Sequence, residues 1–126
     1  MIDKRLYNYK VKEVVKIVDG DTFDATIDLG FNVCVKKRIR MHGINTPECR
    51  TRDLKVKKKG LQAKKRLEEY LWGYKTESVF IESHGNGKYG RLIARVFVGE
   101  ENRAKKDIAT LMIMEGHGVE YDGGRK

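Results

Sequence analysis

The sequence is poor in proline and cysteine. Pro47 is the only proline, and Cys34 and Cys49 are the only cysteines. Two cysteines outside a CxxC motif form neither a disulfide framework nor a recognisable metal motif, so we expect two free thiols. No apolar run approaches the roughly 20 residues of a membrane span, which excludes a transmembrane helix. No apolar leader is visible, so a cytoplasmic protein is expected, unless a leader was removed.

Positive charge is what the sequence has in excess. Its 126 residues include 27 Lys and Arg against 18 Asp and Glu, a formal net charge of +9. Such a field favours polyanions, so DNA or RNA is the expected partner, although a basic surface can also serve solubility alone. The length suits one domain over residues 1–126, with flexible ends at about 1–6 and 122–126. A monomer is the default, because no heptad pattern appears.

Alternating apolar and polar residues predict five strands, at 7–18, 22–29, 33–41, 78–83 and 91–98. In the second strand the predicted buried face consists of Phe23, Ala25, Ile27 and Leu29. In the third it consists of Val33, Val35, Ile39 and Met41. The Asn86-Gly87 pair predicts a hairpin between the last two strands.

Helical periodicity appears twice. Residues 61–71 predict an amphipathic helix, and residues 107–115 predict a second helix with Asp107 as N-cap and Gly116 at its end. The tail 121–126 is expected to be unstructured. Together the elements predict a mostly β fold with helices (α+β), namely a five-stranded Greek-key barrel of the oligonucleotide-binding (OB) type with two to three helices.

Polar motifs cluster at the predicted loops and strand ends. They are Asp19-Gly20-Asp21-Thr22, Arg40, Asn45-Thr46-Pro47-Glu48 and Lys88-Tyr89-Gly90-Arg91. Each motif alone has a plain structural interpretation as a turn or a solvated strand end. In a meander, however, the first loop and the end of the third strand can meet. Asp21 and Asn45 would then offer oxygens to one hard cation, with Thr46 adding a backbone carbonyl.

These three motifs, in this order, resemble those of the thermonuclease (staphylococcal nuclease-like) family: DGDT at 19–22, the segment from Arg40 to Glu48, and KYGR at 88–91. The resemblance implies a barrel-type endonuclease that cleaves DNA and RNA with calcium and leaves 3′-phosphate ends. By position it implies a metal-binding Asp21 with a Thr46 carbonyl, phosphate-binding Arg40 and Arg91, and Glu48 as general base. Lys88 and Tyr89 match residues that contact a nucleotide phosphate.

These roles also agree with the chemistry of the side chains, apart from the resemblance. Two guanidinium groups that remain charged can stabilise the negative charge that develops on a phosphodiester under attack. Glu48 can deprotonate the attacking water, and Pro47 restricts the backbone that directs Glu48 into the site.

Asn45 departs from the family, which usually has a carboxylate there. A neutral amide oxygen makes the site less negative, so we expect weaker or less selective calcium binding, with Mn²⁺ or Mg²⁺ as other possible ions. Asp19 and Asp24 are the carboxylates available to support the site from further out.

A basic segment follows Glu48 and predicts a rim that tracks phosphates. Its members are Arg50, Arg52, Lys55, Lys57, Lys58, Lys59, Lys64, Lys65 and Arg66. A solvated helix face is the simpler interpretation of the same run. Tyr121 lies near family tyrosines that approach the nucleotide, but the register does not place it. The main alternative function is a catalytically inactive nucleic-acid-binding OB domain. A basic scaffold or membrane-surface protein is disfavoured, since no basic amphipathic helix carries bulky aromatic residues.

Overall fold

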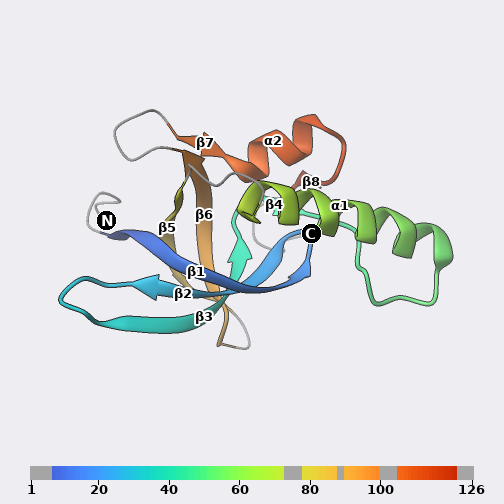
Figure 1. Cartoon of the computed structure of the whole chain (residues 1–126). Coiled ribbons are helices and arrows are strands. Elements are labelled where there is room, and N and C mark those ends of the chain that lie inside the picture. Colours follow the sequence, from blue (N-terminus) through green and yellow to red (C-terminus); the bar gives the residue numbers. More distant parts are fainter. Residues whose placement is uncertain (1–6, 73–77, 88–89, 100–104, 122–126) are drawn as a thin grey trace.

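Five strands close into a barrel in the computed structural model of the chain, which describes residues 7–72, 78–87, 90–99 and 105–121 (Figure 1). The strands are β1 (Asn8–Asp19), β2 (Thr22–Asp28), β3 (Cys34–Met41), β5 (Ser78–Asn86) and β6 (Leu92–Gly99). Their order is β3-β2-β1-β5-β6, and a parallel pairing of β3 with β6 closes the barrel. The predicted OB-type α+β fold is confirmed.

The barrel interior is filled by the alternating residues of its strands. Phe23, Ile27 and Ile39 are fully buried, as the sequence pattern predicts. The prediction is wrong for Leu29 and Val33, which are exposed. Both flank the β2–β3 turn, which extends beyond the barrel, so no layer covers them. Phe31, in that turn, is 98% exposed.

Two helices accompany the barrel, α1 (Leu54–Trp72) and α2 (Ile108–Met114). The second matches its prediction, because the Asp107 carboxylate accepts a hydrogen bond from the Ala109 amide as N-cap. The first begins well before the predicted residue 61. Its start is fixed by Asp53, whose carboxylate accepts hydrogen bonds from the amides of Lys55 and Val56. None of the described helices is both long and apolar enough to cross a bilayer.

Three two-residue strands were not predicted: β4 (Ile44–Asn45), β7 (Lys106–Asp107) and β8 (Val119–Glu120). β7 extends the sheet beside β6, whereas β4 and β8 pair with each other. Just after β8, the Tyr121 amide donates a hydrogen bond to the Gly43 carbonyl at 3.2 Å. The expectation of an unstructured tail is therefore wrong for Tyr121; residues 122–126 and 1–6 lie outside the described part of the chain.

A polar cluster joins the two helices. The Arg66 guanidinium donates to both carboxylate oxygens of Glu115, at 2.8 and 2.9 Å, and the Tyr70 hydroxyl donates to Glu115 at 2.6 Å. The bonds from Arg66 hold the pKa of Glu115 down at about 2, while burial raises the pKa of Tyr70 to about 12. Arg66 was predicted to belong to the phosphate-tracking rim, but this cluster occupies its guanidinium.

Candidate active site

The Asp-Gly-Asp turn between β1 and β2 holds the segment 46–49 at two points. Asp21 accepts a hydrogen bond from the Thr46 amide at 3.0 Å, and Asp19 accepts one from the Cys49 amide at 3.2 Å. Glu48 lies between these two anchors with its side chain exposed. Pro47 therefore shares the task of fixing the Glu48 backbone with two buried or partly buried hydrogen bonds.

Helix α1 supports the same segment from behind. A Cβ atom at Gly60 would overlap the carbonyl group of Glu48, and one at Gly20 would come within 2.6 Å of the Ala63 side chain. The Cys49 thiol also donates to the Gly60 carbonyl at 3.4 Å. Only residues without bulk allow such close contact. The position of Glu48 thus depends on small residues in α1 and in the Asp-Gly-Asp turn.

Arg40, near the end of β3, is fixed by backbone oxygens. Its Nη1 donates to the carbonyls of Met41 at 2.8 Å and Ile44 at 2.7 Å. Its Nη2 lies 3.6 Å from Asp21 Oδ2 and 3.4 Å from Asn45 Oδ1, which are long contacts. The guanidinium also lies 5.2 Å from the centre of the Tyr121 ring. The Arg40 guanidinium is therefore surrounded by Asp21, Asn45 and the Tyr121 ring, and Asp21 in turn holds the Thr46 amide.

Arg91 lies at the start of β6, which runs parallel to β3. Leu92 pairs with Ile39, and Ile93 pairs with Arg40. Because each residue advances a strand by about 3.3 Å, the Arg91 backbone lies roughly 7 Å along the strands from the rung of Arg40. Arg40, near the end of β3, and Arg91, directly before β6, therefore lie at the same end of these two paired strands. Lys88 and Tyr89, the other two predicted contacts, lie outside the described residues.

The oxygen atoms around Asp21 are of the kind that hard cations prefer. They are the Asp21 carboxylate, the Asn45 amide oxygen and the Thr46 oxygens, and Thr46 Oγ1 is buried with no hydrogen-bond partner among the described residues. Only Asp21 carries a formal charge, and Arg40 stands beside it. In the described part of the chain, no three His, Cys, Asp or Glu side chains are grouped to hold a metal. The donor set fits a weakly held cation that keeps most of its water.

Neither predicted supporting carboxylate faces this site freely. Asp24 forms a two-bond ion pair with Arg38, at 2.8 and 3.1 Å, and Asp19 binds the Cys49 amide. Burial and the neighbouring Asp19 raise the pKa of the Cys49 thiol to about 11, so it stays protonated at neutral pH. A thiolate mechanism beside Glu48 is therefore disfavoured.

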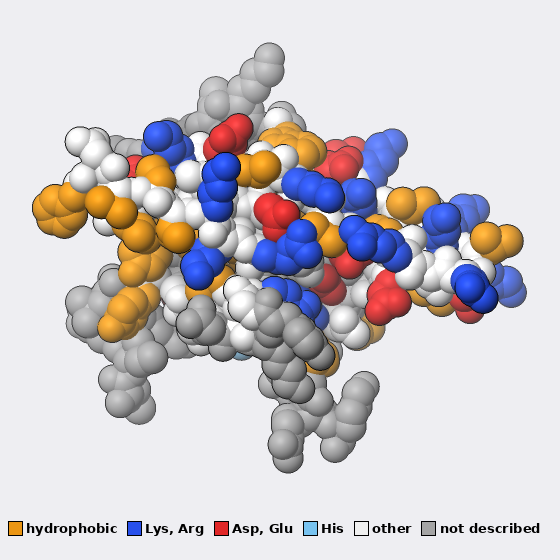
Figure 2. Space-filling view, turned by 90° about the horizontal axis from the view of Figure 1, so that it is seen from below, with side chains coloured by type: hydrophobic (Ala, Val, Ile, Leu, Met, Phe, Trp, Pro, Cys, Tyr) orange, Lys and Arg blue, Asp and Glu red, His pale blue; other side chains and the backbone are white. Residues whose placement is uncertain are grey.

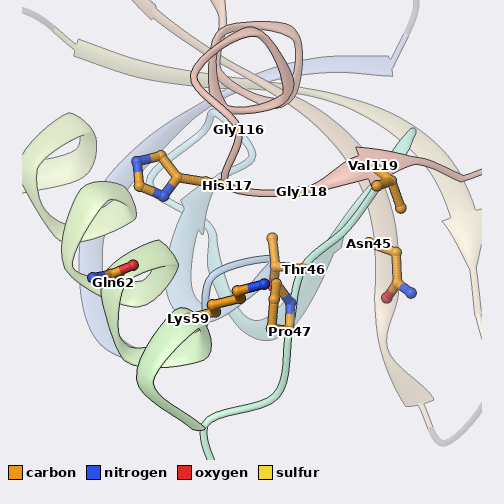
Figure 3. Close-up of a pocket in the computed structure, with 9 residues that line it drawn as sticks. All are labelled: Asn45, Thr46, Pro47, Lys59, Gln62, Gly116, His117, Gly118 and Val119. Carbon is orange, nitrogen blue, oxygen red and sulfur yellow. The ribbon is translucent and has the colours of Figure 1, made fainter. Parts of the chain in front are cut away.

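A pocket of about 490 Å³ opens beside the same segment. Its wall from β4 and the following loop consists of Asn45, Thr46 and Pro47. Lys59 and Gln62 of α1 form a second wall, and residues 116–119 form the third, between α2 and β8 (Figure 3). The candidate catalytic segment thus has a pocket on its α1 side.

Basic side chains spread over the face seen in Figure 2, with acidic ones among them. On α1, the side chains of Lys55, Lys57, Lys58 and Lys59 are all exposed. They follow the loop after Glu48 along the chain, and the phosphate-tracking role of this rim stays a prediction. Lys64 is half-buried, and Arg66 is paired with Glu115.

A family model described as staphylococcal nuclease homologue matches residues 38–125. The chain belongs to this family. The match covers the end of β3 with Arg40, the Glu48 segment, α1, the hairpin with Arg91, and Tyr121, but not the turn that contains Asp21. A comparison with curated proteins finds no match. The predicted family is therefore confirmed, and its members are generally nucleases that act on nucleic acids.

Sequence reasoning missed three features of the site in this staphylococcal nuclease homologue. Asp19 was expected to be a turn residue or a more distant carboxylate of the cation site, Gly60 was left outside the predicted helix 61–71, and Tyr121 was assigned to an unstructured tail. For Gly60 a signal existed, since a glycine inside a helical pattern often marks close backbone approach. For Asp19 and Tyr121 the partners are distant in sequence, and no local pattern reveals them.

Proposed function

We propose that this staphylococcal nuclease homologue hydrolyses phosphodiester bonds of DNA or RNA with little sequence preference. The observation that carries the proposal is the arrangement around Arg40. A guanidinium fixed by two carbonyls stands beside Asp21 and next to the segment that presents Glu48. Guanidinium groups that are already positioned when charge develops stabilise a transition state most effectively.

In the proposed reaction, Glu48 takes a proton from a water molecule whose oxygen attacks phosphorus. The Glu48 side chain is exposed, so substrate and water can both reach it. The bond from phosphorus to the 5′-oxygen breaks, the departing 5′-oxygen takes up a proton from solvent water, and the phosphate stays on the 3′ side. Arg40 and Arg91 bind the non-bridging oxygens as their negative charge grows.

A divalent cation would be held by Asp21, Asn45 and a Thr46 oxygen. When bound, it would add positive charge beside the phosphate. We propose Ca²⁺ as the ion, with Mn²⁺ and Mg²⁺ as alternatives, because the oxygen donors are hard and Asn45 contributes no charge. The Asp21 carboxylate also positions Thr46, so its loss would disturb both the cation and the catalytic segment.

The alternative is a binding domain without catalysis. Against it stands Glu48, an exposed carboxylate beside a basic surface, where it repels phosphate and weakens binding. Glu48→Gln removes the charge and keeps the size. We expect this variant to lose cleavage of single-stranded DNA by about a hundredfold or more while binding it as well as the parent or better.

Glu13→Gln is the matched control, because Glu13 is an exposed glutamate on β1. It should cut like the parent. The measurement is release of labelled fragments with Ca²⁺, paired with affinity determined in chelator. Equal cleavage by Glu48→Gln and the parent would contradict the role of Glu48. If the parent binds the DNA but does not cut it with Ca²⁺, Mn²⁺ or Mg²⁺, the result would support a binding domain without catalysis.

A further inference from the structure

The pocket between α1, β4 and the α2–β8 connection has a lining suited to an anionic ligand. Nine of the described residues line it, and among these nine the Lys59 ammonium is the one full charge and no carboxylate is present. Gln62 and His117 add groups that both donate and accept hydrogen bonds. In Figure 3, the Lys59 side chain reaches from α1 toward Thr46 and Pro47.

The opposite side of the pocket offers apolar surface and accessible backbone. Pro47 and Val119 contribute apolar faces, and Gly116 and Gly118 carry no side chains. The volume, about 490 Å³, falls in the range of small-molecule sites, roughly 300–1,000 Å³. A ligand with a flat apolar ring, polar edges and a phosphate matches this combination.

The walls of the pocket are fixed by the fold. After α2, the amides of Gly116 and His117 bond back to the carbonyls of Ile113 and Met112, which turns the chain toward α1. Gly118 packs so closely on β4 that a Cβ there would lie 2.8 Å from the Ile44 side chain. The pocket is therefore built into the structure before any ligand arrives.

We propose that this pocket is a nucleotide subsite for the substrate strand next to the phosphate held at Arg40. The proposal rests on the proposed nuclease function. Asn45 lines the pocket and its Oδ1 also lies 3.4 Å from Arg40 Nη2, so the pocket adjoins the group around Arg40 through a shared residue. Lys59 binds the phosphate of the neighbouring nucleotide, and Gln62 and His117 contact its base. The exposed Lys55, Lys57 and Lys58 lie further along the same helix.

Lys59→Ala tests the subsite, and Lys12→Ala is the matched control. Both remove one exposed charge, but Lys12 lies on β1 and does not line the pocket. The probe is a single-stranded tetranucleotide, titrated in chelator so that no cation takes part. We expect Lys59→Ala to weaken binding about tenfold and Lys12→Ala less than twofold. Gln62→Ala should weaken binding about threefold without changing its salt dependence, since no charge is lost.

Equal losses for Lys59→Ala and Lys12→Ala would overturn the subsite. A second readout is the NMR signal of the His117 ring, which should shift with the tetranucleotide but not with inorganic phosphate at the same concentration. A shift of equal size with phosphate alone would reduce the site to an anion site and overturn the nucleotide assignment. If the parent cleaves DNA while these tests fail, only the subsite is wrong; if the parent neither binds nor cleaves, the proposed function itself is wrong.

Discussion

Two aspartate–arginine pairs link β2 and its preceding turn to β3, and they differ in exposure, distance and hydrogen bonding. Asp24 and Arg38 are directly opposite in the sheet and form two short bonds, with side chains 28% and 47% exposed. Asp21 and Arg40 are 3.6 Å apart, with side chains only 10% and 12% exposed. The exposed pair satisfies itself, and Arg38 lowers the pKa of Asp24 through their hydrogen bond.

The buried pair instead divides its bonds among other groups. Asp21 binds Thr22 and the Thr46 amide, and Arg40 binds two backbone carbonyls. Each group is positioned without being neutralised by a short mutual bond. Burying both charged groups costs desolvation free energy, so a contribution to stability alone does not explain why they lie there. The pair with the poorer ion-pair geometry is the one that we propose binds an outside charge.

Removing each arginine in turn gives the largest contrast. Arg40→Ala should lower kcat/KM for single-stranded DNA by about two to three orders of magnitude, since it removes a positioned cation from the transition state. Arg38→Ala should change it by less than about threefold and lower stability by less than about 1 kcal/mol, because exposed pairs contribute little. Steady-state kinetics and urea unfolding measure both. Similar losses of activity in the two variants would contradict a special role for Arg40 in catalysis.

Gly60→Ala tests the support behind the buried pair. In an ordinary helix this change stabilises by roughly 1 kcal/mol, but here the new Cβ would overlap the Glu48 carbonyl. We expect destabilisation by about 1–3 kcal/mol and at least a tenfold loss of cleavage. Leu61→Ala, at an exposed neighbouring position, should leave cleavage unchanged. A more stable and fully active Gly60→Ala protein would show that α1 does not position Glu48.

Asn45→Asp adds a second carboxylate beside the buried pair. The extra charge should tighten Ca²⁺ binding by about tenfold, because cation sites gain affinity with each anionic ligand. Calorimetric titration measures the change, with Asn32→Asp in the exposed β2–β3 turn as the control. Unchanged affinity in Asn45→Asp would mean that Asn45 does not face the cation.

The Arg66–Glu115 pair is a third ion pair, and its hydrogen bonds are short like those between Arg38 and Asp24. The pKa of Glu115 is about 2 in the folded protein, below the ordinary 4.5. The stability that the ionised Glu115 contributes is therefore fully present above pH 4.5 and is lost as the pH falls toward 2. Glu115→Gln should unfold more easily than the parent by about 1 kcal/mol at pH 7, and the difference should shrink toward pH 3. A difference that is constant with pH would contradict this assignment.

The sequence predicted the parts of the fold that depend on local pattern. Phe23 and Ile27 alternate with polar residues, and Asp107 caps its helix, so both elements were found. The start of α1 was missed because residues 55–59 are mostly lysine and carry no apolar stripe. The pairing of β4 with β8 was missed because it joins two-residue strands from distant parts of the chain. Tyr121 depends on that pairing, and so it could not be placed beside Arg40.

The most direct test of the account is cleavage of an end-labelled single-stranded DNA by the unmodified protein, with and without a chelator, followed by analysis of the new ends. The account predicts fragments that require a divalent cation and carry 3′-phosphate groups. Intact DNA that nonetheless binds the protein, with affinity falling steeply as salt rises, would contradict it. The site around Arg40 would then belong to a binding barrel.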